Sequence, residues 1–171
     1  MSYQPLVAVP EPTILLKILQ EQKETNEKIT NLEKFAATAA TAYRGTAQKI
    51  PNSVATVITI NTALYDPNKL FNLVEGAYIA PEKGLYQVTG TVALTTVAEA
   101  EIWPDIRKNG ADALRGTRLH KQIGVINVMV SGLMPCEAGE KIQLQVVQIS
   151  GAEVELEILP VENRLSVVRV A

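Results

Sequence analysis

A long stretch without glycine or proline follows residue 12. Neither residue type occurs from Thr13 to Arg44, and apolar residues at both ends of this stretch follow alternating spacings of three and four, with polar residues at the middle positions. This spacing predicts a helix over residues 13–41, with Thr13 as N-cap or Pro12 just before it. With Leu15 at heptad position a, the a and d positions are Leu15, Ile18, Gln22, Thr25, Ile29, Leu32, Ala36 and Ala39.

Two arrangements of this helix fit the pattern. In a coiled coil the apolar stripe packs against copies of itself, and Lys28 at position g and Glu33 at the following e can pair between parallel strands. The alternative is a single amphipathic helix that lies on the rest of the chain. Charged residues between the apolar ones leave a narrow stripe, which favours the coiled coil. Because four heptads are marginal alone, the coil needs a neighbouring domain that self-associates.

From Tyr43 onward the apolar period changes to two. Strands are predicted at 54–60, 85–94, 101–108, 111–118, 123–133, 141–149, 154–159 and 164–170. Asn109-Gly110, between two of them, is the strongest hairpin signal in the chain. Eight or nine strands separated by turns predict a mainly β head over residues 42–171, a sandwich of the jelly-roll kind.

Residues 1–12 differ from both of these parts. Three prolines space an apolar segment without lysine, which predicts an extended peg. Its apolar side chains include Leu6, Val7 and Val9. We expect this segment to add a strand or a plug to a partner protein.

Composition narrows the possible functions. Sixteen Lys and Arg against eighteen Asp and Glu give a net charge of −2, so the basic surplus that favours nucleic-acid binding is absent. No run of 18 apolar residues predicts a membrane span, and the first residues do not have the pattern of a standard signal peptide. One cysteine, Cys136, and one histidine, His120, exclude an intrachain disulfide and a histidine-rich metal centre. We expect no cofactor, no metal and no catalytic activity.

Several short motifs of the β region occur in a characteristic order. Phe71 precedes Gly76-Ala77-Tyr78-Ile79-Ala80-Pro81, and Gly84-Leu85-Tyr86, Asn109-Gly110 and Gly139-Glu140 follow. This order resembles the complement globular-head and tumour-necrosis-factor-like superfamily over roughly residues 42–171. The chain departs from it at Val88, where an aromatic is usual, and at Glu140, which replaces Asp.

The resemblance implies a ten-strand jelly roll that forms a homotrimer about a three-fold axis, with the helix as its stalk. Peg, short coil and head in this order also resemble small bacteriophage fibre, spike and capsid-decoration proteins. We therefore expect a non-enzymatic virion protein that is assembled in the host cytoplasm and docked on capsid or tail proteins through its N-terminus. The alternative is a tail-fibre adhesin or a soluble lectin that recognises a host surface glycan or protein through loops 95–101 and 117–124.

A candidate partner or ligand surface surrounds the most basic stretch of the head. Its members are Trp103, Arg115, Arg118, His120 and Lys121. These residues could contact an anionic polymer or a sugar ring. The alternatives are local ion pairs for the charges and core or trimer packing for Trp103, whose neighbour Pro104 favours an edge or bulged strand.

Glu153, Glu155 and Glu157 alternate with apolar residues. As a functional site, this row could bind calcium or perform acid–base hydrolysis. The pattern instead favours a solvated strand face, because alternation marks a half-exposed strand and a catalytic acid needs an apolar or crowded pocket.

Overall fold

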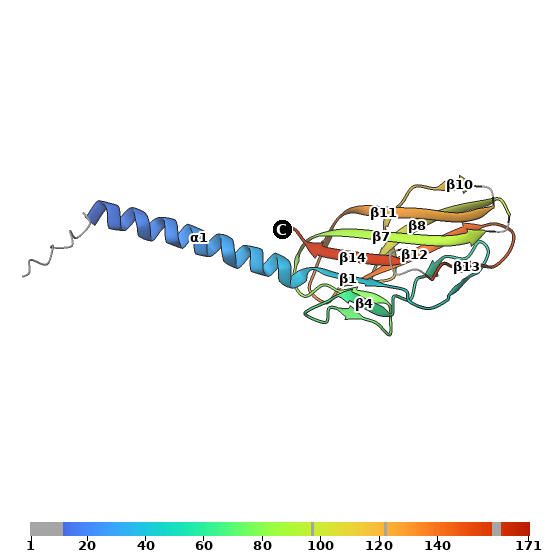
Figure 1. Cartoon of the computed structure of the whole chain (residues 1–171), viewed down its shortest axis with the longest axis horizontal. Coiled ribbons are helices and arrows are strands. Elements are labelled where there is room, and N and C mark those ends of the chain that lie inside the picture. The colour runs from blue at the N-terminus through green and yellow to red at the C-terminus, as the bar shows by residue number, and fades with distance from the viewer. Residues whose placement is uncertain (1–11, 97, 122, 159–161) are drawn as a thin grey trace, which may run out of the picture. The chain divides into compact units, whose positions relative to one another are not determined.

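The computed structural model describes residues 12–96, 98–121, 123–158 and 162–171, with the backbone alone for Lys121. The chain divides between Lys34 and Phe35 into two compact units. A single helix, α1 (Pro12–Thr38), supplies the described part of the first unit and the opening turn of the second (Figure 1). The helix predicted over 13–41 is confirmed in position but ends at Thr38, because the chain enters strand β1 at Ala40.

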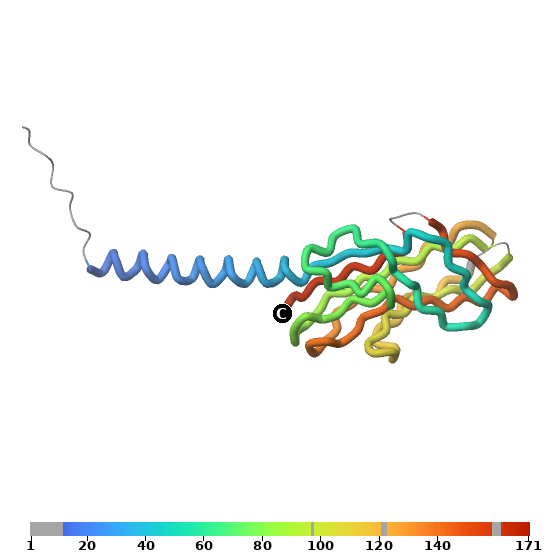
Figure 2. The backbone as a smooth tube through the Cα atoms, turned by 90° about the horizontal axis from the view of Figure 1, so that it is seen from below, coloured from blue at the N-terminus to red at the C-terminus, as the bar shows by residue number. Residues whose placement is uncertain are grey.

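The second unit is a sandwich of two antiparallel sheets (Figure 1). Sheet A has the order β2–β13–β7–β14–β1–β4, and β11 pairs with β7 as well. Its strands are β1 (Ala40–Tyr43), β2 (Lys49–Ile50), β4 (Thr62–Tyr65), β7 (Gly84–Thr96), β11 (Gly124–Cys136), β13 (Val154–Leu156) and β14 (Arg164–Arg169). In Figure 2 the strand that follows the helix runs beside the C-terminal strand, drawn in red.

Sheet B has the order β10–β8–β12–β6–β5, with β3 paired to β12 and β9 paired to β8. Its strands are β3 (Thr56–Val57), β5 (Phe71–Asn72), β6 (Ala77–Ile79), β8 (Ala100–Lys108), β9 (Ala111–Arg115), β10 (Leu119–Lys121) and β12 (Lys141–Ile149). The mainly β jelly-roll sandwich expected from the sequence is thereby confirmed.

The core lies between the two sheets and is built by alternation along the strands. Tyr78 and Tyr86 are fully buried, and Tyr78 meets the rings of Phe71 and Tyr86 edge-on. Gly90 on β7 leaves room for the facing sheet, since an added Cβ would lie 2.5 Å from Cδ1 of Leu144. Tight packing of this kind fixes the distance between the sheets.

The Asn109-Gly110 hairpin is confirmed. It joins β8 to β9, and both turn residues have positive φ, 50° and 84°. Such φ values are expected for the two central residues of a type I′ turn, which explains why this pair was readable from sequence.

Other local expectations were wrong. The described residues form fourteen strands rather than eight or nine, because several strands are only two or three residues long. Of the strand expected at 54–60, only Thr56–Val57 forms, since the chain turns tightly where Ile60 N donates to the Ile58 carbonyl. The expected loops 95–101 and 117–124 are partly strand, as β7 continues to Thr96, β8 begins at Ala100 and β10 lies within the second loop.

The sequence predicted an edge or bulged strand at Trp103-Pro104, and of these two alternatives the edge strand is wrong. Strand β8 lies inside sheet B, with β12 on one side and β9 and β10 on the other. Proline is tolerated there because the β9 ladder stops at Asp105 and the β10 ladder at Ile102, which leaves a gap beside Pro104. A register shift does occur nearby, between Ile106 and Arg107.

Candidate interaction surface

The outward face of sheet A carries no charge on its two longest strands. Along β7 and β11 the inward positions are buried core residues, and the alternate positions point outward. The outward residues are Leu85, Gln87, Thr89, Thr91, Ala93 and Thr95 on β7, and Val125, Asn127, Met129, Ser131, Leu133 and Pro135 on β11. One residue in five of this chain is charged, so twelve uncharged positions together form a distinct surface.

This face combines exposed apolar side chains with hydroxyl and amide groups that bond one another. Met129 is 59% exposed and Leu133 is 52% exposed. Ser131 Oγ lies 2.8 Å from the Thr89 hydroxyl and accepts a bond from Gln87 Nε2 at 2.9 Å. Because these polar groups are already paired, covering them with another surface costs less than burying free polar groups.

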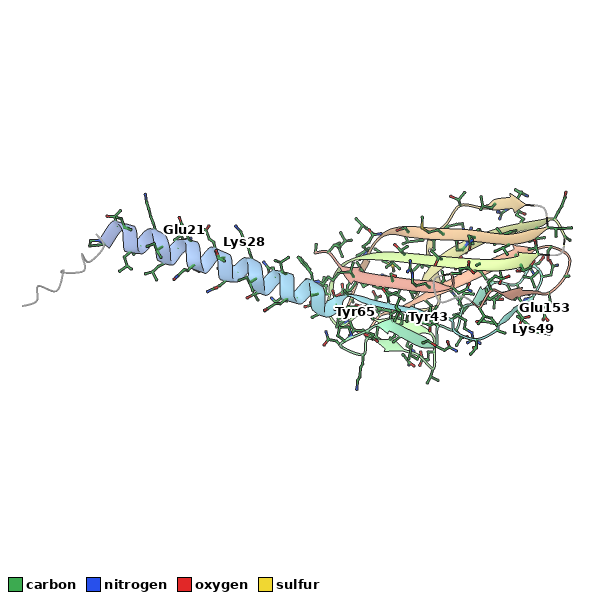
Figure 3. The ribbon with its side chains drawn as sticks, viewed as in Figure 1. Glu21, Lys28, Tyr43, Lys49, Tyr65 and Glu153 are labelled. Carbon is green, nitrogen blue, oxygen red and sulfur yellow. The ribbon has the colours of Figure 1, made fainter. Side chains whose placement is uncertain are left out.

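A shallow groove crosses the same face where β4, β1, β14 and β7 lie side by side. Its side chains come from these four strands and include Thr41, Tyr65, Gln87, Thr89, Ser166 and Val168. Thr41 donates to Ser166 across the β1–β14 pair at 3.1 Å. Tyr65, labelled in Figure 3, is about half exposed. The groove and the β11 stripe thus lie on different strands of the outward face of sheet A.

The outward face of sheet B is different, because charged residues alternate along β8. Glu101 and Asp105 point outward with Trp103 between them. Glu101 receives Arg118 Nη1 at 2.8 Å and lies 3.2 Å from His120 Nε2. The guanidinium carbon of Arg118 lies 4.0 Å from the centre of the Trp103 ring, which is 8% exposed.

Four members of the predicted basic surface are thus placed. Arg118 and His120 contact Glu101, and Trp103 lies under the guanidinium of Arg118. Arg115 lies apart from this group, where its guanidinium pairs with Asp105 at 2.9 Å and with Asp112 at 3.2 Å. The side chain of Lys121 lies outside the described residues. The charges are paired locally, and Arg118 occupies a ring face that a sugar would need, so the geometry favours the structural alternative over a ligand site.

The glutamate row is a solvated strand face. Glu153 pairs with Lys49 at 2.8 Å where β2 meets β13, as Figure 3 shows, and Glu155 is exposed. Among the described residues no group of three or more His, Cys, Asp or Glu side chains is placed to hold a metal ion. Burial of the Cys136 thiol and the nearby Glu140 carboxylate raise the pKa of the thiol, which keeps it protonated at neutral pH.

The predicted coiled-coil residues lie on a helix that exposes its apolar side chains. Between Leu15 and Ala36 the predicted seam has five apolar residues. Four of them, Leu15, Ile18, Ile29 and Leu32, are 43–66% exposed. Gln22 and Thr25 lie between the two apolar pairs, and Thr25 Oγ1 donates to the Glu21 carbonyl. Figure 3 shows Glu21 and Lys28, seven residues apart, on the same side of α1. The helix therefore presents two apolar segments of the predicted seam, separated by Gln22 and Thr25, and the apolar side chains of both are uncovered.

The predicted peg residues Leu6, Val7 and Val9 lie outside the described residues. Within the described chain, α1 lacks the sustained apolar length that crossing a bilayer requires.

The uncharged face of sheet A was missed by the sequence reasoning. Its signal is present in the sequence, because every second residue from Leu85 to Thr95 and from Val125 to Pro135 is uncharged. Finding it requires knowing that both segments belong to one sheet and which of the two faces is outward.

Comparisons with known proteins support the fold. No protein-family model matches the chain, and no curated protein matches its sequence. One similar solved structure is an Eiger tumour necrosis factor from S. frugiperda, with 12% identity and a TM-score of 0.59 over 78% of this chain and 92% of that one. Another is the globular domain of zebrafish complement 1qA, with 11% identity and a TM-score of 0.54 over 78% of this chain and 97% of that one. A third is murine APRIL, with 12% identity and a TM-score of 0.54 over 77% of this chain and 99% of that one. At these identities the likeness establishes a tumour-necrosis-factor- and complement-like jelly-roll fold.

Proposed function

We propose that this protein is a non-enzymatic structural protein that forms homotrimers through the outward face of sheet A and displays its heads on a virus particle. The observation that carries the proposal is the absence of charge from the outward positions of β7 and β11. Depletion of charged residues is the compositional mark of the centre of a protein interface. Sheet B, with its charged outward positions, would then face solvent.

A closed ring of three copies needs two different patches on each protomer. Sheet A offers both, namely the apolar stripe of Met129 and Leu133 on β11 and the groove beside Tyr65. Seating the stripe of one copy in the groove of the next would remove exposed apolar area on both sides, which is favourable by about 25 cal/mol per Å².

The helix supports the same assembly. An isolated helix of this length is marginal in water, and exposed Leu and Ile side chains at a and d positions are stabilised when copies pack together. Joined heads raise the effective concentration of three helices, so a weak coil can form beside a stronger interface. A short coiled-coil stalk is therefore part of the proposal.

Attachment to the particle is assigned to residues 1–12. Their apolar, proline-spaced sequence suits an extended segment that adds to a capsid or tail protein. The particle surface is then the proposed location, with a short spike, head fibre or capsid decoration as the role. Because Arg115 pairs with Asp105 and Arg118 pairs with Glu101, the basic stretch offers less support for a glycan-binding adhesin or lectin.

Light scattering on the purified full chain tests the assembly directly. Three chains of 18.6 kDa predict a particle of about 56 kDa at micromolar concentration. A stable, folded monomer under the same conditions would overturn the proposal. Deleting residues 1–12 should leave the shortened chain trimeric and abolish its incorporation into particles. Normal incorporation of this variant would refute the anchoring role of residues 1–12.

A further inference from the structure

The charged side chains that lie beside the uncharged outward positions of β7 and β11 include two of opposite sign. Arg164 on β14 pairs with Thr91 in the β7 ladder and so shares its outward side. Glu162, two residues earlier, lines a small pocket on that side together with Thr91, Asn127 and Met129. Among the described outward positions of β7, β11 and β14, Arg164 is the only charged residue.

Both charges lack a partner within the described chain. Glu162 Oε2 is buried and accepts no hydrogen bond, and the hydroxyl of Thr91 in the same pocket is buried without a partner too. The Arg164 guanidinium makes no ion pair or hydrogen bond in the described residues. A buried carboxylate oxygen without a donor is costly, whereas pairing with a guanidinium gives a strong, directional contact.

We propose that each Glu162 pairs with the partner subunit's Arg164, so that three such ion pairs join the heads of the trimer. This inference rests on the proposed homotrimer and names the polar contact that sets its register. The two residues are close in sequence and lie on the same face, so a rotation that brings this part of the sheet against its copy can bring the opposite charges together. Thr91 and Asn127 supply oxygen acceptors for the remaining guanidinium N–H groups.

Charge reversal provides the test, with the mass measured over a dilution series. Glu162→Arg and Arg164→Glu should each raise the concentration at which half of the trimer dissociates by at least about tenfold. The double variant Glu162→Arg/Arg164→Glu should restore it. The neutral variants Glu162→Gln, which keeps the side-chain size, and Arg164→Gln, which shortens the side chain, should give smaller shifts in the same direction. They cover the case in which a reversal prevents folding.

Mixing distinguishes a contact between copies from a pair within one chain. Equal amounts of the two single reversals present Arg at both positions on one protomer and Glu at both on the other. A contact between copies therefore predicts mixed oligomers, detectable by native mass spectrometry, at concentrations where neither variant assembles alone. Absence of mixed oligomers, with the double variant still restored, would place the pair within one chain and overturn the proposal.

A control variant and the wild-type chain separate the possible failures. Glu137→Arg removes an exposed pair with Lys83 and should leave the dissociation concentration unchanged. If the wild type is trimeric and both reversals dissociate as it does, the Glu162–Arg164 contact is refuted while the trimer stands. If the wild-type chain is monomeric, the trimer itself is refuted, and this contact with it.

Discussion

The buried hydroxyl of Tyr78 donates to the backbone carbonyl of Thr38, the last residue of α1, at 2.8 Å. The side chain of Thr38 adds two bonds, since its Oγ1 accepts from Arg169 N and donates to the Phe35 carbonyl. Asn68 Nδ2 donates to the carbonyl of the preceding residue, Ala37. The sandwich therefore supplies the partners that the last carbonyls of a helix lack.

Replacing Tyr78 with Phe should lower the free energy of unfolding by about 1–3 kcal/mol, because the Thr38 carbonyl is left buried without its donor. Chemical denaturation at fixed protein concentration measures this loss. Tyr86→Phe is the matched control, since Tyr86 donates to the less buried Glu82 carbonyl and its loss should cost less. Equal losses of unfolding free energy in the two variants would show that the hydrogen bond to Thr38 stabilises the fold no more than the bond to Glu82 does.

Alkaline pH should destabilise the head in steps. Burial is the main cause that raises the pKa of the Cys136 thiol above its ordinary 9.0 and the pKa of the Tyr78 and Tyr86 hydroxyls above 10.0. As pH rises, the unfolded chain releases the protons of these three groups before the folded chain does. The contribution of the three groups to stability is therefore complete below their ordinary pKa values and is lost as pH rises past those values. Denaturation midpoints should be level near neutral pH and fall above about pH 9. The decline should be shallower in Tyr78→Phe, and an equally steep decline would exclude Tyr78 as a cause.

The long strands and the tight hairpin were readable from sequence because their signals are local. Asn109-Gly110 adopts the positive φ values that these residue types favour, and the strand predicted at 141–149 is β12 with the same bounds. Short strands such as Thr56–Val57 exist only because Gln145 and Val146 on β12 pair with them, and nothing within two residues encodes such a distant partner.

The candidate surfaces were predicted less well, for a related reason. Arg118 and His120 were grouped by nearness in sequence, but their common partner, Glu101, follows from the pairing of His120 with Glu101 between β10 and β8. Ion pairs across a sheet depend on register, and register is set by the packing of whole strands.

Replacing Arg115 with Ala should lower the free energy of unfolding, because it leaves the Asp105 carboxylate, 1% exposed, without its cation. Calorimetry or denaturant titration provides the measurement. The double variant Arg115→Ala/Asp105→Asn removes the buried charge and should recover most of the loss. A double variant no more stable than the single one would mean that lost packing, and not the unpaired charge, is responsible.

Removing the Arg118 guanidinium should uncover the only tryptophan of the chain. In Arg118→Ala we expect the emission of Trp103 to move to longer wavelength and its quenching by acrylamide to increase, because the guanidinium covers the ring face. His120→Ala is the control, since that side chain contacts the same Glu101 but is not stacked on the ring. Unchanged emission in Arg118→Ala would mean that other groups shield the indole.

The proposed stalk predicts that seam residues of α1 matter far more than their neighbours. Leu32→Ser should melt the helical circular-dichroism signal at lower temperature, since burying a leucine in a seam is worth about 1.5–3 kcal/mol. Asn31→Ser, one residue away and off the seam, should leave the melt unchanged, and both variants should remain trimeric because the heads associate through sheet A. If the two variants melt alike, Leu32 is exposed in solution as it is in the single chain, and the helices do not pack on one another.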